Sequence, residues 1–270
     1  MNVNKLKKLL AVPSKTYLET PMVCWLLDYF FRKGVVARAD RFNNVYVIKS
    51  HSDRPLLPCV AAHLDTVQPI RNVHIIEDGG RLIGRYRNKQ VGIGADDKTG
   101  IYTCLELIDR FSEIAAVFFA MEEHGYQGAM RADPDFFKRI GYVIEFDCPS
   151  RRMVSYSCGG ERLFEHQGEF ITRALPVLRK HGSVHWQRHP YTDVTGLRKR
   201  FALSMLNLSS GYYNWHADNE FVKISDVELA IEQGADLIAA LDCVRYPCPR
   251  RIVDTCDAPV KVGELKVLDP

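Results

Sequence analysis

The sequence predicts an α/β fold of three layers, in which helices cover both faces of a mostly parallel, mixed central sheet. Short apolar runs rich in β-branched and aromatic residues occupy 55–65, 114–121 and 142–146 and alternate with segments of helical periodicity. Each run is almost continuously apolar, as expected of a strand buried on both faces, and then stops at polar residues. With 46% hydrophobic residues in 270, the chain can fill one core of this size.

The first predicted helix covers 17–34. Its apolar side chains, including Met22, Leu26 and Phe30, recur at helical spacing, and the pattern ends at Gly34. The segments that follow predict two strands with a turn over 36–50, a buried strand over 55–65, and a hairpin over 73–87 that turns at Asp78-Gly79-Gly80.

A second helix is predicted after Asp97, where Ile101, Leu105 and Ile108 lie on one face, so that Asp96 stands just ahead of the helix. Beyond the strands over 114–121 and 142–146, the sequence predicts a helix over 161–181, a polar loop up to Arg200, a strand over 201–209, and a last helix that opens with a capping box from Ser225 to Glu228.

These elements are expected to form one domain over 1–270. Its core covers about 15–242, and residues 243–270, rich in proline and charge, are expected to wrap the surface as a tail. No stretch approaches the ~18 consecutive apolar residues of a membrane span. The N-terminal segment 1–14 lacks the long apolar region of an export signal, so the sequence predicts a soluble cytoplasmic protein.

The charge balance gives no sign of a nucleic acid or membrane partner. There are 36 basic against 33 acidic residues, a formal net charge of +3. The one short basic run, Arg198 to Arg200, is expected to be a solvated loop.

The eight cysteines are scattered along the chain. Most lie in apolar segments, where a free thiol behaves as a small core residue, and a cytosolic protein rarely keeps disulfides. Cys243, Cys248 and Cys256 leave a disulfide or a metal knuckle open, although they lack the C-x-x-C spacing of a zinc site.

Histidines and acidic residues cluster at the ends of the predicted strands. Because parallel strands deliver their carboxyl ends to one edge of a sheet, these residues are expected to meet there. Two imidazoles with several carboxylates are what a two-metal hydrolytic site requires, with zinc favoured and manganese or cobalt as alternatives. The residues are His63 and Asp65 in AAHLDTV, Asp96 and Asp97 in GADDKTG, Glu122 and Glu123 in AMEEHG, Asp147 in VIEFDCP, and His216 in YYNWHADNE.

Taken one at a time, each of these residues has an ordinary explanation. Asp96 and Asp97 could cap a helix, and Glu122 and Glu123 could be surface charges. Their common position at strand ends is what favours the metal site. Five further histidines fit no such pattern, although one of them could reach the site: His124, His166, His181, His185 and His189.

Over about residues 55–240 the series resembles the zinc-dependent exopeptidases with a co-catalytic metal pair, which include peptidase T, the carboxypeptidases related to it and bacterial aminopeptidases. The resemblance implies that Asp96 bridges two divalent ions. It also implies that Glu122 is the general base and that Asp65 orients His63. The metal ligands it implies are His63, Asp96, Glu123, Asp147 and His216.

The predicted reaction is metal-assisted attack of water on an amide, with a small peptide as the substrate. Glu122 would take a proton from the water and pass it to the leaving nitrogen. Residues just before His216 could hold a substrate terminus or stabilise the oxyanion, although tyrosines that only pack the loop are an equal alternative. These candidates are Gly211, Tyr212, Tyr213 and Asn214.

The lid-bearing members of this superfamily insert a dimerisation domain between the late aspartate and the final histidine, whereas its compact aminopeptidases do not. Here the interval from Asp147 to His216 is 69 residues and must also hold a helix and two strands, so a single catalytic domain without a lid is predicted. Without a lid to clamp a carboxylate, an aminopeptidase is favoured over a carboxypeptidase. Alternatives are an N-acyl amino acid deacylase and a metal-binding relative without catalysis, and association into a homo-oligomer is left open.

Overall fold

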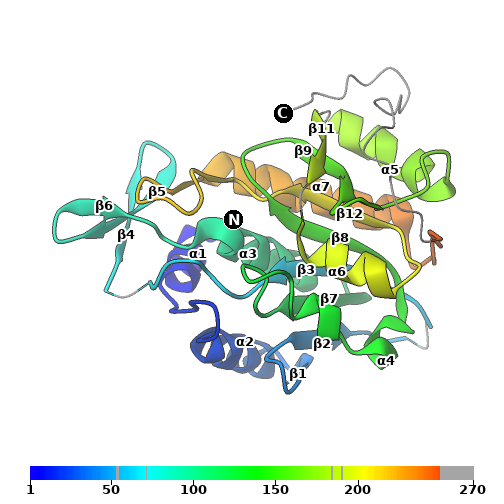
Figure 1. Cartoon of the computed structure of the whole chain (residues 1–270), viewed down its shortest axis with the longest axis horizontal. Coiled ribbons are helices and arrows are strands. Elements are labelled where there is room, and N and C mark those ends of the chain that lie inside the picture. Colours follow the sequence, from blue (N-terminus) through cyan, green and yellow to red (C-terminus); the bar gives the residue numbers. More distant parts are fainter. Residues whose placement is uncertain (53–54, 71, 184, 190, 250–270) are drawn as a thin grey trace.

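The computed structural model describes residues 1–52, 55–70, 72–183, 185–189 and 191–249. Within them one central sheet has the strand order β1-β2-β7-β3-β8-β12-β9-β10, with β11 paired to β9 (Figure 1). Its strands are Val36–Ala39 (β1), Val45–Lys49 (β2), Leu57–His63 (β3), Ile114–Phe119 (β7), Ile140–Cys148 (β8), Met153–Cys158 (β9), Glu161–Arg162 (β10), His185–His189 (β11) and Met205–Ser209 (β12).

The centre of the sheet is parallel and its flanks are antiparallel. Strands β7, β3, β8 and β12 run parallel to one another, whereas β2 and β9 pair with them in the opposite direction. Every residue of these four central strands is buried, which explains why their sequences are nearly continuous apolar runs. The predicted α/β fold with a mixed central sheet is confirmed.

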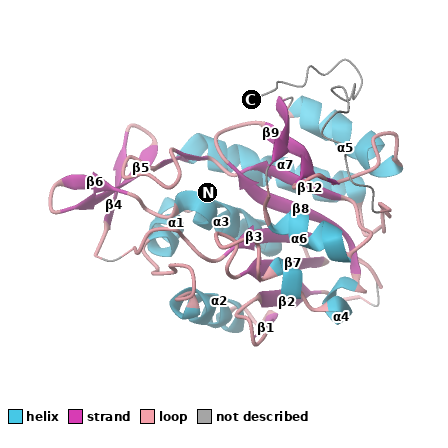
Figure 2. Ribbon diagram, in the orientation of Figure 1, coloured by secondary structure: helices cyan, strands magenta, loops and turns pink. Residues whose placement is uncertain are grey.

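Helices cover both faces of this sheet (Figure 2). Gly234 of α7 lies so close to Leu107 of α3 and Phe146 of β8 that an added Cβ would stand 2.8 Å from each. The neighbouring Glu145 instead accepts a hydrogen bond from Thr192, just ahead of α6. Successive strand residues point to opposite faces, so α3 and α7 cover one face and α6 the other. The helices are Val3–Leu10 (α1), Thr20–Arg32 (α2), Ala95–Arg110 (α3), Pro134–Phe137 (α4), Glu169–Lys180 (α5), Asp193–Arg200 (α6) and Ile224–Leu241 (α7), with a 3₁₀ turn at Ala129–Arg131.

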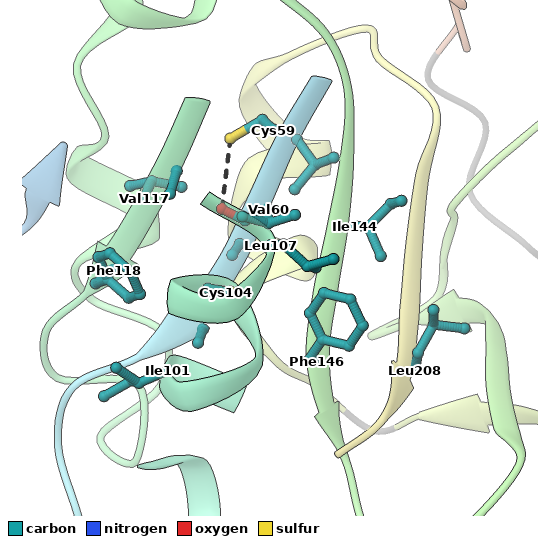
Figure 3. Close-up of a cluster of buried hydrophobic side chains, with 14 of the residues drawn as sticks. Cys59, Val60, Ile101, Cys104, Leu107, Val117, Phe118, Ile144, Phe146 and Leu208 are labelled. Atoms are coloured by element: carbon teal, nitrogen blue, oxygen red, sulfur yellow. Dashed lines mark hydrogen bonds between the residues drawn. The ribbon is translucent and has the colours of Figure 1, made fainter. Parts of the chain in front are cut away.

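The core lies between α3 and the sheet. Figure 3 shows Leu107 of α3 beside Phe146 of β8, with Val60 of β3 and Ile144 of β8 near them, and all four side chains are fully buried. Removing such a side chain from water stabilises a fold by roughly 1.5–3 kcal/mol. This packing fixes α3, and with it the loop that precedes the helix, against the carboxyl ends of the strands.

Most described cysteines belong to the core, as predicted. Cys59, Cys104, Cys148 and Cys158 are buried free thiols, and Cys248 is buried as well. Burial raises the pKa of the Cys59 thiol, which keeps it protonated and unreactive. Cys243 is partly buried, whereas Cys256 and the segment 250–270 lie outside the described residues, so the disulfide or metal knuckle left open for these cysteines stays untested.

A small second sheet holds the predicted hairpin. His74–Asp78 (β4) and Arg81–Tyr86 (β5) form the hairpin, and Lys89–Val91 (β6) pairs with β5. Figure 1 shows these three strands extending from the body of the molecule. β5 also pairs with Phe221–Lys223 (β14), which in turn pairs with Tyr212–Tyr213 (β13). The hairpin therefore supports the loop between β13 and β14, which carries His216.

The N-terminal segment differs from the prediction in two respects. An additional helix, α1, buries Leu6, Leu9 and Leu10. The predicted helix over 17–34 begins only at Thr20, because Pro21 occupies its first turn, where the missing N–H costs nothing. Among the described helices, none has both the length and the apolar character needed to cross a bilayer.

The region from 161 to 200 is more structured than predicted. Of the predicted helix over 161–181, only the part over Glu169–Lys180 is helical, as α5, while Glu161 and Arg162 pair with β9. The predicted loop up to Arg200 contains β11 and α6. The prediction of a solvated loop at Arg198 is wrong, because this residue lies in α6 and its guanidinium is fully buried. It donates hydrogen bonds to the backbone carbonyls of Arg162, Phe201, Leu203, Cys248 and Pro249.

The C-terminal helix and tail differ from the prediction in some details. The capping box from Ser225 to Glu228 is wrong: α7 starts at Ile224, and its N-cap residue, Lys223, makes no side-chain cap. The Ser225 hydroxyl donates instead to Asp226. Of the predicted tail, the described part packs against the body through buried Tyr246 and Cys248.

Candidate metal centre

The carboxyl ends of the central strands bring the predicted site residues together. His63 is the last residue of β3, Asp147 lies near the end of β8, and Glu122 and Glu123 follow β7. Asp96 comes from the first turn of α3, and His216 from the loop between β13 and β14. Segments from five parts of the chain thus converge on one edge of the sheet, as the strand pattern predicts.

Asp96 stands between the two histidines. Its Oδ1 lies 3.1 Å from His63 Nε2, and its Oδ2 lies 3.5 Å from His216 Nε2. Each imidazole has a second carboxylate beside it. Asp147 Oδ1 is 3.5 Å from His63 Nε2, and Glu123 Oε1 is 2.8 Å from His216 Nε2. The site therefore has two halves, each with one imidazole and one carboxylate of its own, that share the carboxylate of Asp96.

The pKa values of this cluster reflect the burial of its carboxylates and their contacts with the imidazoles. Burial raises the pKa of Asp147 to about 6, against the opposing effect of His63. Burial also raises the pKa of Glu123. Hydrogen bonds to Asp96 and Glu123 raise the pKa of His216 to about 10. Asp147, Glu123 and His216 thus all bind protons more tightly than they would in water, as expected where several carboxylates are packed together.

Asp97 is a further carboxylate beside His63. Ligand atoms of His63, Asp97 and Asp147 lie within 4.8 Å of one another, as do those of His63, Asp96 and Glu123. The oxygens of Asp97, however, already accept hydrogen bonds from the backbone N–H of His63, at 3.3 Å, and of Gly100, at 3.1 Å. We therefore assign Asp97 to the support of the site and Asp96 to its centre. The peptide bond between them is cis.

Gly100 allows this support to form. An added Cβ would lie 2.4 Å from both carboxylate oxygens of Asp97 and from the carbonyl oxygen of Phe146. Any larger residue would push Asp97 away from the backbone of His63. The last residue of GADDKTG is thus determined by packing.

Asp65 contacts both His63 and the turn that carries the two glutamates. The Nδ1–H of His63 donates to the backbone carbonyl of Asp65, at 2.9 Å, while the carboxylate lies 3.6 Å from that nitrogen. The carboxylate accepts instead from the backbone N–H groups of Glu122, at 2.9 Å, and Glu123, at 3.3 Å, and from the Thr16 hydroxyl, at 2.9 Å. One residue therefore orients the imidazole and fixes the turn that carries both glutamates.

Unlike Glu123, Glu122 has a carboxylate without a hydrogen-bond or ion-pair partner among the described residues. The side chain is buried, and burial raises its pKa well above the ordinary value, with Asp147 adding to the effect and His63 opposing it. It lines the same cavity as Glu123. A carboxylate with raised proton affinity, held at the site but outside the paired ligands, is suited to proton transfer.

A cavity of about 390 Å³ opens over the centre. Four carboxylates, His216 and residues of β11 surround it. The residues that line it are Asp96, Glu122, Glu123, Asp147, Pro149, Met153, Gln187, Arg188, His189, Tyr191, Tyr212, Trp215 and His216. The sequence left His189 as one of five histidines without a role, and it missed Gln187 and Arg188.

The four predicted substrate residues have different positions. Tyr212 lines the cavity, and its hydroxyl lies 3.3 Å from Asp147 Oδ1. The Tyr213 hydroxyl donates to Asp226, and Asn214 donates to the carbonyl of Asn219, so neither side chain belongs to the cavity lining. Gly211 has a φ of 89° and lies close to the α7 backbone at Val227. Of the four, only Tyr212 is placed to contact a ligand.

Glu220 is a supporting residue that the sequence analysis missed. Its carboxylate accepts hydrogen bonds from four consecutive backbone N–H groups ahead of and within the first turn of α3. Gly94, one of the four, has a φ of 60°, which glycine adopts without strain. Negative charge at a helix N-terminus is favourable, and here it fixes the loop that presents Asp96. The four donors are Ile93, Gly94, Ala95 and Asp96.

Comparison with solved structures places this fold among known ones. Aminopeptidase PepT from Bacillus cereus has a TM-score of 0.76 over 88% of this chain and 97% of its own, at 14% identity. A tripeptidase from Staphylococcus aureus has a TM-score of 0.76 over 89% and 98%, at 14% identity. The TET1 peptidase of Pyrococcus horikoshii, which can assemble into a tetrahedron or a large octahedral shell, has a TM-score of 0.64 over 87% and 98%, at 14% identity.

At these identities the likeness establishes a shared fold. A scan of family models finds no match to the chain, and a search of curated proteins finds none either.

Proposed function

We propose that this protein is a two-metal exopeptidase, of the aminopeptidase type, that acts on short peptides. The observation that carries the proposal is the position of Asp96 between His63 and His216, each of which has a carboxylate of its own. A shared carboxylate with two such halves is the ligand arrangement of a metal pair.

The donor set fits two divalent ions. His63 and Asp147 would hold one ion, His216 and Glu123 the other, and Asp96 would contact both. Imidazole and carboxylate donors suit zinc best, and manganese or cobalt also accept them. Bound ions at such a site lower the pKa of a water molecule and polarise the scissile carbonyl.

The protein's own residues supply the remaining steps. Glu122 takes the proton of the attacking water and delivers it to the leaving nitrogen, because it is the carboxylate at the cavity without an imidazole partner. Asp65 keeps Glu122 in place through its backbone N–H, and it fixes the tautomer of His63 through its carbonyl. Tyr212, hydrogen-bonded to Asp147, forms one wall for the substrate.

Action at the amino end of a peptide agrees with the charges around the cavity. Four carboxylates line it; three of them are the proposed metal ligands, which leaves Glu122 as the acidic side chain available to a free ammonium group of the substrate. The solved structures of the same fold include an aminopeptidase and a tripeptidase, which supports the same choice.

A substrate panel tests the proposal. We expect protein loaded with zinc, manganese or cobalt to hydrolyse aminoacyl fluorogenic amides and short peptides, and to lose that activity on chelation. Preferential hydrolysis of N-acetyl amino acids would identify a deacylase instead. No hydrolysis of any member with any of the three metals would contradict a catalytic role.

A further inference from the structure

Strand β4 lies at the edge of the small sheet. The strand order there is β13-β14-β5-β4, and among the described residues β4 pairs only with β5. Its exposed residues are His74, Ile76, Glu77 and Asp78, and Figure 1 shows the hairpin extending from the body of the molecule. The outer edge of such a strand presents backbone N–H and C=O groups that can pair with a strand of another chain.

The turn of the hairpin fixes its hydrogen-bond register. Asp78 and Arg81 are paired across Gly79 and Gly80, whose φ values are 55° and 77°. Positive φ at both central positions is typical of a two-residue type I′ turn, in which the flanking residues bond to each other. Asp78 therefore directs its backbone N–H and C=O groups to β5.

Two residues of β4 direct their backbone groups to the outer edge. Because bonded and unbonded positions alternate along antiparallel strands, His74 and Ile76 also bond to β5, whereas Ile75 and Glu77 face outward with their N–H and C=O groups. The side chain of Glu77 lies toward α1, where its Oε2 is 3.4 Å from Lys7 Nζ. The side chain of Ile76 lies on the opposite face of the sheet.

On that opposite face, an apolar row crosses the sheet and ends at Ile76. Phe221 of β14 is directly opposite Ile83 of β5, which in turn is directly opposite Ile76. Residues in such positions share a face, so the three side chains lie in line. Ile83 is 7% exposed, whereas Ile76 at the end of the row is 39% exposed. An apolar side chain beside Ile76 would continue the row.

The charges of β4 suit a second copy of the same strand in antiparallel orientation. A two-fold axis at Ile76 places His74 opposite the second copy's Asp78. Arg85 is directly opposite His74 within the chain, so this carboxylate also offsets the positive charge of Arg85. A parallel pairing in register would instead place the two copies of Asp78 side by side, where they repel each other.

We propose that two copies of this chain associate through β4, as antiparallel strands related by a two-fold axis at Ile76. Ile75 then exchanges a pair of backbone hydrogen bonds with the second copy's Glu77, and the symmetry repeats this pair. In this register the outward-facing groups of both copies meet, and Ile76 packs against the second copy's Ile76. A pairing of two short strands makes a small interface, so the dimer is weak and depends on concentration.

The first test is sedimentation of the full chain over a range of concentrations, comparing the wild type with Glu77→Pro. Proline removes the outward N–H of residue 77 and leaves the bonds between β4 and β5 intact. The matched control is Glu77→Ala, which removes the same side chain and keeps the N–H. We expect Glu77→Pro to raise the Kd of the dimer by roughly tenfold to a hundredfold, because each copy loses one hydrogen bond. The control should leave the Kd nearly unchanged.

The second test uses the position of Ile76 on the two-fold axis. Ile76→Glu and Ile76→Lys each place like charges opposite each other, so each variant alone should be a monomer. Mixing the two proteins places opposite charges there and should produce a heterodimer, which native mass spectrometry identifies by its mass. Association on mixing also shows that both variants are folded.

Other results overturn the inference in distinguishable ways. A wild type that stays monomeric at every concentration refutes the dimer, and a dimer that all four variants leave intact uses another surface. An equal effect of Glu77→Ala and Glu77→Pro would assign the association to the glutamate side chain and refute backbone pairing. A mixture of the two Ile76 variants that stays monomeric would refute the register.

Discussion

At the scale of single residues, two adjacent glutamates have separate environments. Glu123 pairs with His216 at 2.8 Å, whereas the carboxylate of Glu122 has no partner among the described residues. Asp65 holds the backbone N–H groups of both, so the difference arises from the direction of the side chains. This separation supports the proposal that Glu123 binds metal and Glu122 moves protons.

The first prediction concerns Glu122. Glu122→Gln should retain two metal ions per chain and lower kcat by roughly 10²–10⁴-fold, because an amide cannot accept the proton of water. Glu123→Gln is the matched control and should lose metal. Elemental analysis beside steady-state kinetics checks both, and a fully active Glu122→Gln protein would remove Glu122 from the mechanism.

The second prediction concerns Glu220, whose carboxylate accepts four backbone N–H groups. Glu220→Gln replaces a charged acceptor by an amide whose NH₂ faces donors. We expect a loss of roughly 1.5–3 kcal/mol in the free energy of unfolding and a metal affinity weaker by about 10–100-fold. Urea titration and metal titration measure the two effects.

Asp218→Asn is the control for this variant, since Asp218 is an exposed acid in the same loop. It should alter neither quantity. Equal effects of the two substitutions would mean that Glu220 acts only through its contribution to net charge.

At the scale of elements, α6 is joined to the C-terminal segment by a buried cation. The carbonyls that Arg198 binds come from β10, from the segment between α6 and β12, and from residues 248 and 249. The segment after α7 is thereby fastened to the domain. Thr192, just ahead of α6, donates a hydrogen bond to Glu145 of β8, so α6 is also attached to the sheet that carries the site.

The third prediction follows from this contact. Arg198→Ala should lower the free energy of unfolding by about 3–5 kcal/mol, because it leaves several buried carbonyls without donors and opens a cavity. Arg173→Ala, at an exposed ion pair, should cost at most about 0.5 kcal/mol. Urea denaturation compares them, and similar midpoints for the two variants would contradict the structural role of Arg198.

At the scale of the whole molecule, the metal centre joins segments that are far apart in sequence. Its donors come from three strand ends, one helix start and one loop. Ions bound to these donors would neutralise buried carboxylates that otherwise repel one another. Metal binding should therefore stabilise the domain as a unit.

The fourth prediction is that chelation lowers the melting temperature. An ion at about 1,000 times its Kd contributes about 4 kcal/mol, which for a domain of this size corresponds to roughly 8–16 °C. Differential scanning fluorimetry with a chelator, followed by zinc addition, measures the change and its reversal. Asp96→Asn should respond much less, and an unchanged melting temperature of the wild type would argue against bound metal.

The sequence could predict the sheet, its helices and the place where site residues meet, because buried parallel strands leave continuous apolar runs that end in polar residues. It could not predict the residues that hold the site in place from outside the proposed ligand set. Asp97 and Glu220 bind backbone N–H groups, and any acidic residue near a helix start has the same local sequence signature. Arg188 reaches the cavity through a register shift in a short polar strand, and Arg198 is buried by contacts with distant carbonyls. Neither leaves a periodic pattern.

The pairing of β14 with β5 carries a consequence for the order of assembly during synthesis. His216 and Glu220 belong to the last quarter of the chain, yet Glu220 fixes the backbone ahead of Asp96, and β14 joins a hairpin made much earlier. A nascent chain that has emerged only as far as residue 215 has the central strands, His63 and Glu122, but lacks both His216 and the carboxylate of Glu220 that holds the backbone ahead of Asp96. If the protein is the hydrolase proposed above, it becomes competent for hydrolysis only after residues 216–223 have joined the hairpin made earlier.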